Sequence, residues 1–198
     1  MAAASAHPRL NFRADDLFFS AMAAVALVVV LVGFARTYFL AGLFRAPLPN
    51  LLVHIHAAAF TSWIALLLTQ ISLVTARRVD LHRRLGQLGL ALAVLMIVLG
   101  VLTASDRLAR QSANPGAFSI EEVRHLYSVS IADILIFGSF VYFGYRNRFR
   151  SAVHKRLMLF ATFALLDAAF DRWPHLLSQT VAWQSFTIWV QRHMPSFS

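Results

Sequence analysis

The chain has 198 residues, of which 59% are hydrophobic and only 14% are charged, and its mean hydropathy is +0.63. This composition excludes a soluble domain of the same size, because such a domain has about 25% charged residues. A net charge of +9 would indicate nucleic-acid binding in a soluble protein, but here most cations stand beside apolar segments, where they set membrane orientation. We therefore expect an integral membrane protein that contacts the lipid bilayer and no nucleic acid.

Apolar segments long enough to cross a bilayer follow one another along the chain. A helix needs about 20 apolar residues to cross a hydrocarbon core of about 30 Å. The predicted spans are 17–44, 51–76, 85–104, 126–145 and 157–169. The segment 176–190 is shorter and contains Gln179 and Gln184, so it either crosses where the bilayer is thinned or lies at the interface. We expect it to cross, which gives an all-α polytopic membrane helical bundle with five to six transmembrane helices.

No linker divides the chain into domains. Residues 1–16 contain no apolar core ahead of a cleavage site, so we expect a cytoplasmic N-terminal segment followed by an uncleaved anchor helix. Residues 17–198 then form a single transmembrane helical-bundle domain. The four spans after the first are its predicted core helices.

Two turns contain half of the 18 lysine and arginine residues. The first, between the second and third spans, contains Arg77, Arg78, Arg83 and Arg84; the second, between the fourth and fifth, contains Arg146, Arg148, Arg150, Lys155 and Arg156. Lys and Arg are enriched in cytoplasmic loops, so we expect both turns and the N-terminus in the cytoplasm. The turns also share a pattern, LHRRLG at 81–86 and VHKRLM at 153–158, which indicates a duplicated two-helix unit.

The histidines are the candidate cofactor ligands, since the chain has no cysteine and therefore no thiolate. His54, His56 and His125 fall at the outer ends of the second and fourth spans, and His82 and His154 at the inner ends of the third and fifth. A b-type haem needs two neutral imidazoles facing each other across a bundle, so these two layers predict one or two haems b. Residues i and i+2 of a helix point about 200° apart, so only one of His54 and His56 can face a given haem, and we favour His56. If one haem is bound, we expect it in the outer layer.

Two other interpretations of the histidines stay open. At helix ends, histidine, arginine and lysine also extend into the headgroup region without any cofactor, which applies most to His82 and His154. The outer set can instead be a metal site, since zinc, copper and iron all accept imidazole. Its ligands would be His54, His56, His125 and His175, with Asp171 beside them.

Charged residues within apolar spans are costly and therefore mark candidate functional sites. They are Asp133 in the fourth span, and Asp167, Asp171 and Arg172 in and after the fifth. Asp133 lies two turns beyond His125, where a carboxylate can orient a ligand histidine or carry protons. The alternative is an internal ion pair between one of the aspartates and an arginine, which holds helices in register.

The segment 51–173 resembles a family of uncharacterised bacterial multi-pass inner-membrane proteins. Their recurrent motifs are H-x-H, W, Q, L-H-R-R-L-G, H-K-R-L-M and a closing arginine. In this chain they fall on His54, His56, Trp63, Gln70, His82, His154 and Arg172. The resemblance implies a location in the bacterial inner (plasma) membrane and brings no established activity.

The histidine arrangement is also similar to that of the ascorbate-dependent transmembrane di-haem cytochromes b. That family holds its haems on helices two and four and on helices three and five. His54 or His56 with His125, and His82 with His154, match this alternation. The interval between helices two and three is shorter here, and the proline after the first histidine and the serine-rich motif around the helix-four histidine are absent.

These features favour an integral b-type haem protein with bis-histidine ligation that transfers electrons across the membrane, with a quinol or another reductant as donor. One alternative is a non-catalytic membrane subunit of a larger respiratory or photosynthetic complex, or a homodimer. Another is a membrane enzyme or transporter with a histidine-based metal site. The sequence leaves open whether the protein is an enzyme, because it has no phosphate loop, nucleophile elbow or dinucleotide glycine pattern.

Overall fold

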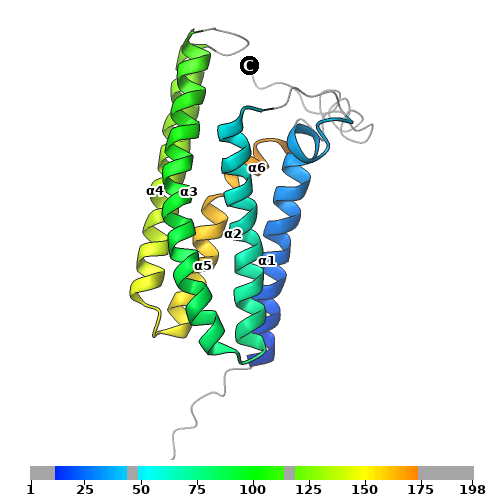
Figure 1. Cartoon of the computed structure of the whole chain (residues 1–198), viewed down its shortest axis with the longest axis vertical. Coiled ribbons are helices and arrows are strands. Elements are labelled where there is room, and N and C mark those ends of the chain that lie inside the picture. Colours follow the sequence, from blue (N-terminus) through cyan, green and yellow to red (C-terminus); the bar gives the residue numbers. More distant parts are fainter. Residues whose placement is uncertain (1–11, 44–48, 114–118, 174–198) are drawn as a thin grey trace, which may run out of the picture.

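A computed structural model describes residues 12–43, 49–113 and 119–173, and within these ranges all regular structure is helical (Figure 1). The elements are α1 (Phe12–Phe34), the π-helix η1 (Ala35–Phe39), α2 (Leu51–Thr75), α3 (Val79–Ala113), α4 (Ile120–Arg146), α5 (Ser151–Ala164) and α6 (Asp167–Phe170). The predicted all-α class is confirmed.

Four helical segments are long and apolar enough to cross a membrane: Leu17–Phe39, Leu51–Thr75, Val79–Ala113 and Ile120–Arg146. The chain is therefore a multi-pass membrane protein. The predicted fifth span, 157–169, is not one continuous helix, because α5 ends at Ala164 and a turn separates it from the four-residue α6. The predicted sixth span, 176–190, lies outside the described residues.

Helices that are consecutive in the sequence pack side by side, α2 on α3, α3 on α4 and α4 on α5 (Figure 1). The first helix closes the bundle by contacting α2, α5 and α6. Both cation-rich turns lie at the same end, where α2 and α4 end and α3 and α5 begin. We call this the basic end, and the end that contains η1 and α6 the opposite end.

Small residues form much of the buried interior. Ala23, Ala26, Ala59, Ala93, Ala161 and Ala169 are all buried. Many large apolar side chains point outward instead, among them Leu17, Leu88 and Leu135, whose exposed fractions are 72%, 66% and 66%. This distribution suits a bilayer, where lipid replaces water around the outer face and small residues let helices approach closely.

One hydrogen bond crosses the centre of the bundle. The indole Nε1 of Trp63 on α2 donates to Oγ1 of Thr162 on α5 at 3.1 Å, and the Thr162 hydroxyl donates to the Met158 carbonyl at 3.1 Å. Trp63 is 3% exposed and Thr162 is 0% exposed. The Trp63 ring also meets Phe137 of α4 edge to face, with ring centres 5.1 Å apart. Three helices are thus joined at this level.

The ends of α5 and α6 are fixed by contacts with α1. At the basic end, the Lys155 ammonium lies 2.6 Å from the Asp15 carboxylate and 4.7 Å from the centre of the Phe19 ring. At the opposite end, the backbone of Ala169 lies directly against Gly33 of α1. The break after α5 contains no glycine or proline that would predict it. It directs α6 towards Gly33, where the buried residues Leu166 and Ala169 pack with Ala26 and Val29.

Replacing Thr162 with valine keeps the shape of the side chain and removes the acceptor of the Trp63 indole. The indole N–H is then buried without a partner, which costs about 1–3 kcal/mol. We expect a lower midpoint of thermal unfolding in detergent. Thr69→Val is the matched control, because the Thr69 hydroxyl is exposed and donates only to Ala65 of its own helix. Equal midpoints for the two variants would contradict a structural role for the Trp63–Thr162 bond.

Replacing Gly33 with alanine places a methyl group 2.5 Å from the Ala169 carbonyl oxygen, so the backbone of α6 must move. Overpacking of this kind costs about 1–3 kcal/mol. The same change at Gly42, where an added Cβ meets nothing within 4 Å, is the control. Thermal unfolding of both purified variants should show destabilisation of Gly33→Ala alone. A Gly33→Ala variant that is as stable as the parent protein would contradict the close contact between α1 and α6.

Candidate functional site

The structure brings the predicted inner pair of histidines together. His82 lies in the first turn of α3 and His154 in the first turn of α5, at the basic end. Their ring centres are 6.3 Å apart and the ring planes are at 84° to each other. Both side chains are half-buried.

Helix periodicity explains why these two rings point into the bundle. On α5, His154, Met158 and Thr162 recur every four residues and share one face, and Thr162 is buried against α2. On α3, His82 stands seven residues before the buried Gly89, so it shares the inward face of that helix. The adjacent Arg83 and Arg84 are exposed, because successive residues of a helix are rotated by about 100°.

Each ring of the inner pair has a nitrogen with no hydrogen-bond partner among the described residues. Nδ1 of His154 lies 2.9 Å from the carbonyl oxygen of Gly144. A carbonyl can only accept, so this Nδ1 carries a proton, and in a neutral imidazole the lone pair is then on Nε2. Nδ1 of His82 is buried and has no hydrogen-bond partner within the described ranges, while the Gln70 backbone carbonyl faces the ring.

Gln70 also belongs to this site, although the sequence analysis named it only as a motif position and not as a site residue. It comes from α2, and its side-chain Oε1 is buried with no hydrogen-bond partner in the described part of the chain. Its amide nitrogen lies 3.6 Å from where a Cβ on Gly86 of α3 would stand. An amide side chain is costly to bury in an apolar span, so its presence in the second span could have marked Gln70 as a candidate site residue from the sequence.

The spacing of the inner pair fits ligation of one metal ion. Two imidazoles on opposite sides of an ion, each bound at about 2 Å, have ring centres roughly 6 Å apart. The 6.3 Å between His82 and His154 agrees with this separation. A hydrogen bond from the second ring nitrogen to a backbone carbonyl, as His154 makes, is also typical of metal-bound histidine.

The outer histidines are not brought together in the same way. His54 Nδ1 lies 3.0 Å from the Tyr38 hydroxyl of η1, whereas His56 stacks on Phe60 with ring centres 4.1 Å apart. Nδ1 of His56 is buried without a partner among the described residues. His125 is exposed on α4, and no ring contact or hydrogen bond within the described ranges joins it to His54 or His56.

The remaining polar residues lie towards the opposite end. Asp133 of α4 is half-buried and close enough to Asp167 of α6 to interact with its charge. The Arg172 guanidinium donates to the Ala168 carbonyl and lies 4.4 Å from the centre of the Phe34 ring. No salt bridge in the described part of the chain joins Arg172 to Asp133, Asp167 or Asp171.

The alternative metal site has no counterpart in the residues that the structure describes. Across 12–43, 49–113 and 119–173, no group of three or more histidine, aspartate or glutamate side chains is placed to hold an ion. His175, the fourth proposed ligand, lies outside these ranges.

Comparison with protein-family models, with curated proteins and with solved structures gave no match to this chain.

Proposed function

We propose that the protein is a b-type haem protein of the bacterial inner membrane that transfers electrons, and that one haem is bound between His82 and His154. A single observation carries this proposal: two histidines from non-consecutive helices, α3 and α5, lie with ring centres 6.3 Å apart, and each has a nitrogen with no hydrogen-bond partner in the part of the chain that the structure describes. The exposed position of His125 favours this inner site over the outer one.

The surrounding residues have separate roles in this proposal. Gly144 holds the His154 ring in one tautomer, so Nε2 is the coordinating atom. Trp63 and Phe137 pack edge to face in the buried apolar core of the bundle. Arg83 and Arg84 provide exposed cations beside His82 that can neutralise the carboxylates of the macrocycle. The bound haem would supply one-electron redox chemistry.

The cation distribution supports an orientation for this bundle. Both turns of the basic end have an excess of Arg and Lys, so we propose that this end and the N-terminus are cytoplasmic. In this orientation the haem lies near the cytoplasmic surface. A quinol, which dissolves in the bilayer, is the proposed class of donor. We also propose five to six spans in total: the four long helices, one span formed by α5 and α6, and a sixth if the segment 176–190 also crosses.

The test is haem binding by histidine variants expressed with excess haem. We expect the parent protein to purify with haem b and a reduced-minus-oxidised difference spectrum, and His82→Ala and His154→Ala to lose most of the haem. His125→Ala is the control, because that side chain is exposed and should leave the spectrum unchanged. Far-ultraviolet circular dichroism checks that each variant is helical.

Two results would contradict the proposal. A parent protein that is colourless after haem-replete expression would leave the non-catalytic subunit as the better hypothesis. Loss of haem in His125→Ala with full retention in His82→Ala would move the site to the outer layer.

A further inference from the structure

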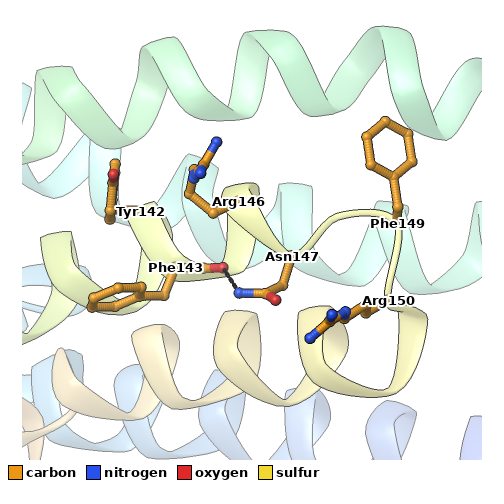
Figure 2. Close-up of a pocket in the computed structure, with 6 residues that line it drawn as sticks. All are labelled: Tyr142, Phe143, Arg146, Asn147, Phe149 and Arg150. Carbon is orange, nitrogen blue, oxygen red and sulfur yellow. Dashed lines mark hydrogen bonds between the residues drawn. The ribbon is translucent and has the colours of Figure 1, made fainter.

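A groove of about 530 Å³ lies on the surface of the basic end, where α4 passes into the turn before α5 (Figure 2). It is lined by Tyr142, Phe143, Arg146, Asn147, Phe149 and Arg150. The histidine site uses none of these side chains, so the groove is a separate feature of this end.

Two cations in the groove have no anionic partner among the residues that the structure describes. Arg146 and Arg150 are exposed, and neither guanidinium forms an ion pair with a carboxylate in the described ranges. Two positive groups in one groove repel each other, so a bound anion would stabilise the pair. Arg148 differs, because it stacks on Tyr145 and Phe149, with its guanidinium 4.5 Å and 4.6 Å from the ring centres.

The cations of the groove are not needed to cap α4. The Asn147 side-chain amide donates to the Phe143 carbonyl at 2.9 Å, as Figure 2 shows, and Arg148 donates to the Tyr145 carbonyl at 3.3 Å. These bonds satisfy carbonyls of the last turn of the helix, where unpaired carbonyls would otherwise attract cations. The guanidinium groups of Arg146 and Arg150 therefore remain available to a ligand.

The other walls of the groove are aromatic and exposed. Phe149 is 81% exposed, and Tyr142 and Phe143 are also exposed large side chains. Aromatic rings are enriched where the headgroup region meets the hydrocarbon core. A ligand that fits this surface has a negative headgroup beside the arginines and an apolar chain along the rings.

We propose that this groove binds an anionic phospholipid, with the phosphate between Arg146 and Arg150 and the acyl chains against Phe149, Tyr142 and Phe143. A basic pocket at the headgroup level of a membrane helix is the kind of site that selects anionic lipids. The aromatic walls favour a lipid over a soluble anion, because an acyl chain can cover the exposed apolar surface of these rings and a soluble anion cannot. This proposal does not depend on haem binding.

Native mass spectrometry of the full-length protein, titrated with phosphatidylglycerol or phosphatidylcholine, tests the site. The parent should retain one phosphatidylglycerol in preference to phosphatidylcholine. The variant Arg146→Gln/Arg150→Gln should bind phosphatidylglycerol about thirtyfold more weakly, because it loses two surface cations. Arg146→Lys/Arg150→Lys keeps the charge and should retain most of the preference.

The matched control is Arg77→Gln/Arg78→Gln, which removes the same charge from the other turn of the basic end and should change binding less than twofold. If this control weakens binding as much as Arg146→Gln/Arg150→Gln, the effect is general surface charge and the proposed site is wrong. Displacement of the lipid by millimolar inorganic phosphate would also overturn it, since the groove would then be a site for soluble anions. The lysine variant and the retained helical circular dichroism distinguish loss of binding from loss of folding.

Discussion

The hydrogen bond between Trp63 and Thr162 joins the short helix α5 to α2 in the buried interior of the bundle. No water is available inside a bilayer to replace a lost hydrogen-bond partner, so the buried Trp63 indole needs an acceptor within the bundle, and the Thr162 hydroxyl provides it. Thr162 and His154 stand on the same face of α5, two turns apart. The bond that turns Thr162 towards α2 therefore also turns His154 towards His82. The ion pair of Lys155 with Asp15 fixes the same helix to α1 one residue beyond His154.

The repeated histidine and cation pattern has one geometric explanation in both turns. In each copy the histidine lies half-buried at the start of a helix, and the following residues rotate away from the interior. Arg83, Arg84 and Arg156 are accordingly exposed, while Lys155 reaches Asp15 of α1. The same short pattern therefore places a histidine towards the interior of the bundle and exposed cations beside it.

Much of this arrangement could be predicted from the sequence. The apolar runs predicted both ends of α2 and the C-terminal end of α4 to within one residue. In contrast, α4 begins at Ile120, six residues before the predicted start, and α3 extends from Val79 to Ala113, well beyond the predicted 85–104. That extension is polar and amphipathic, so hydropathy alone does not reveal it. The pairing of His82 with His154 also followed from the alternation of helix directions.

Other features needed the packed structure. The break between α5 and α6 depends on the fit of Ala169 against Gly33, a contact between residues 136 positions apart that no local pattern records. The exposure of His125 depends on which face of α4 is inward. Val123, two residues earlier, is buried, and the rotation between the two positions turns His125 outward. The apolar pattern of the sequence indicated the height of His125 in the membrane, but not which face of α4 is inward.

The central claim is that His82 and His154 together ligate one haem. Near-infrared magnetic circular dichroism of the ferric parent protein tests it most directly, because the charge-transfer band of a low-spin haem reports its two axial ligands. We predict one haem per chain with a band characteristic of two imidazoles, and its replacement by a high-spin spectrum in any residual haem of His154→Ala. A bis-imidazole band that persists unchanged in both His82→Ala and His154→Ala would contradict the account.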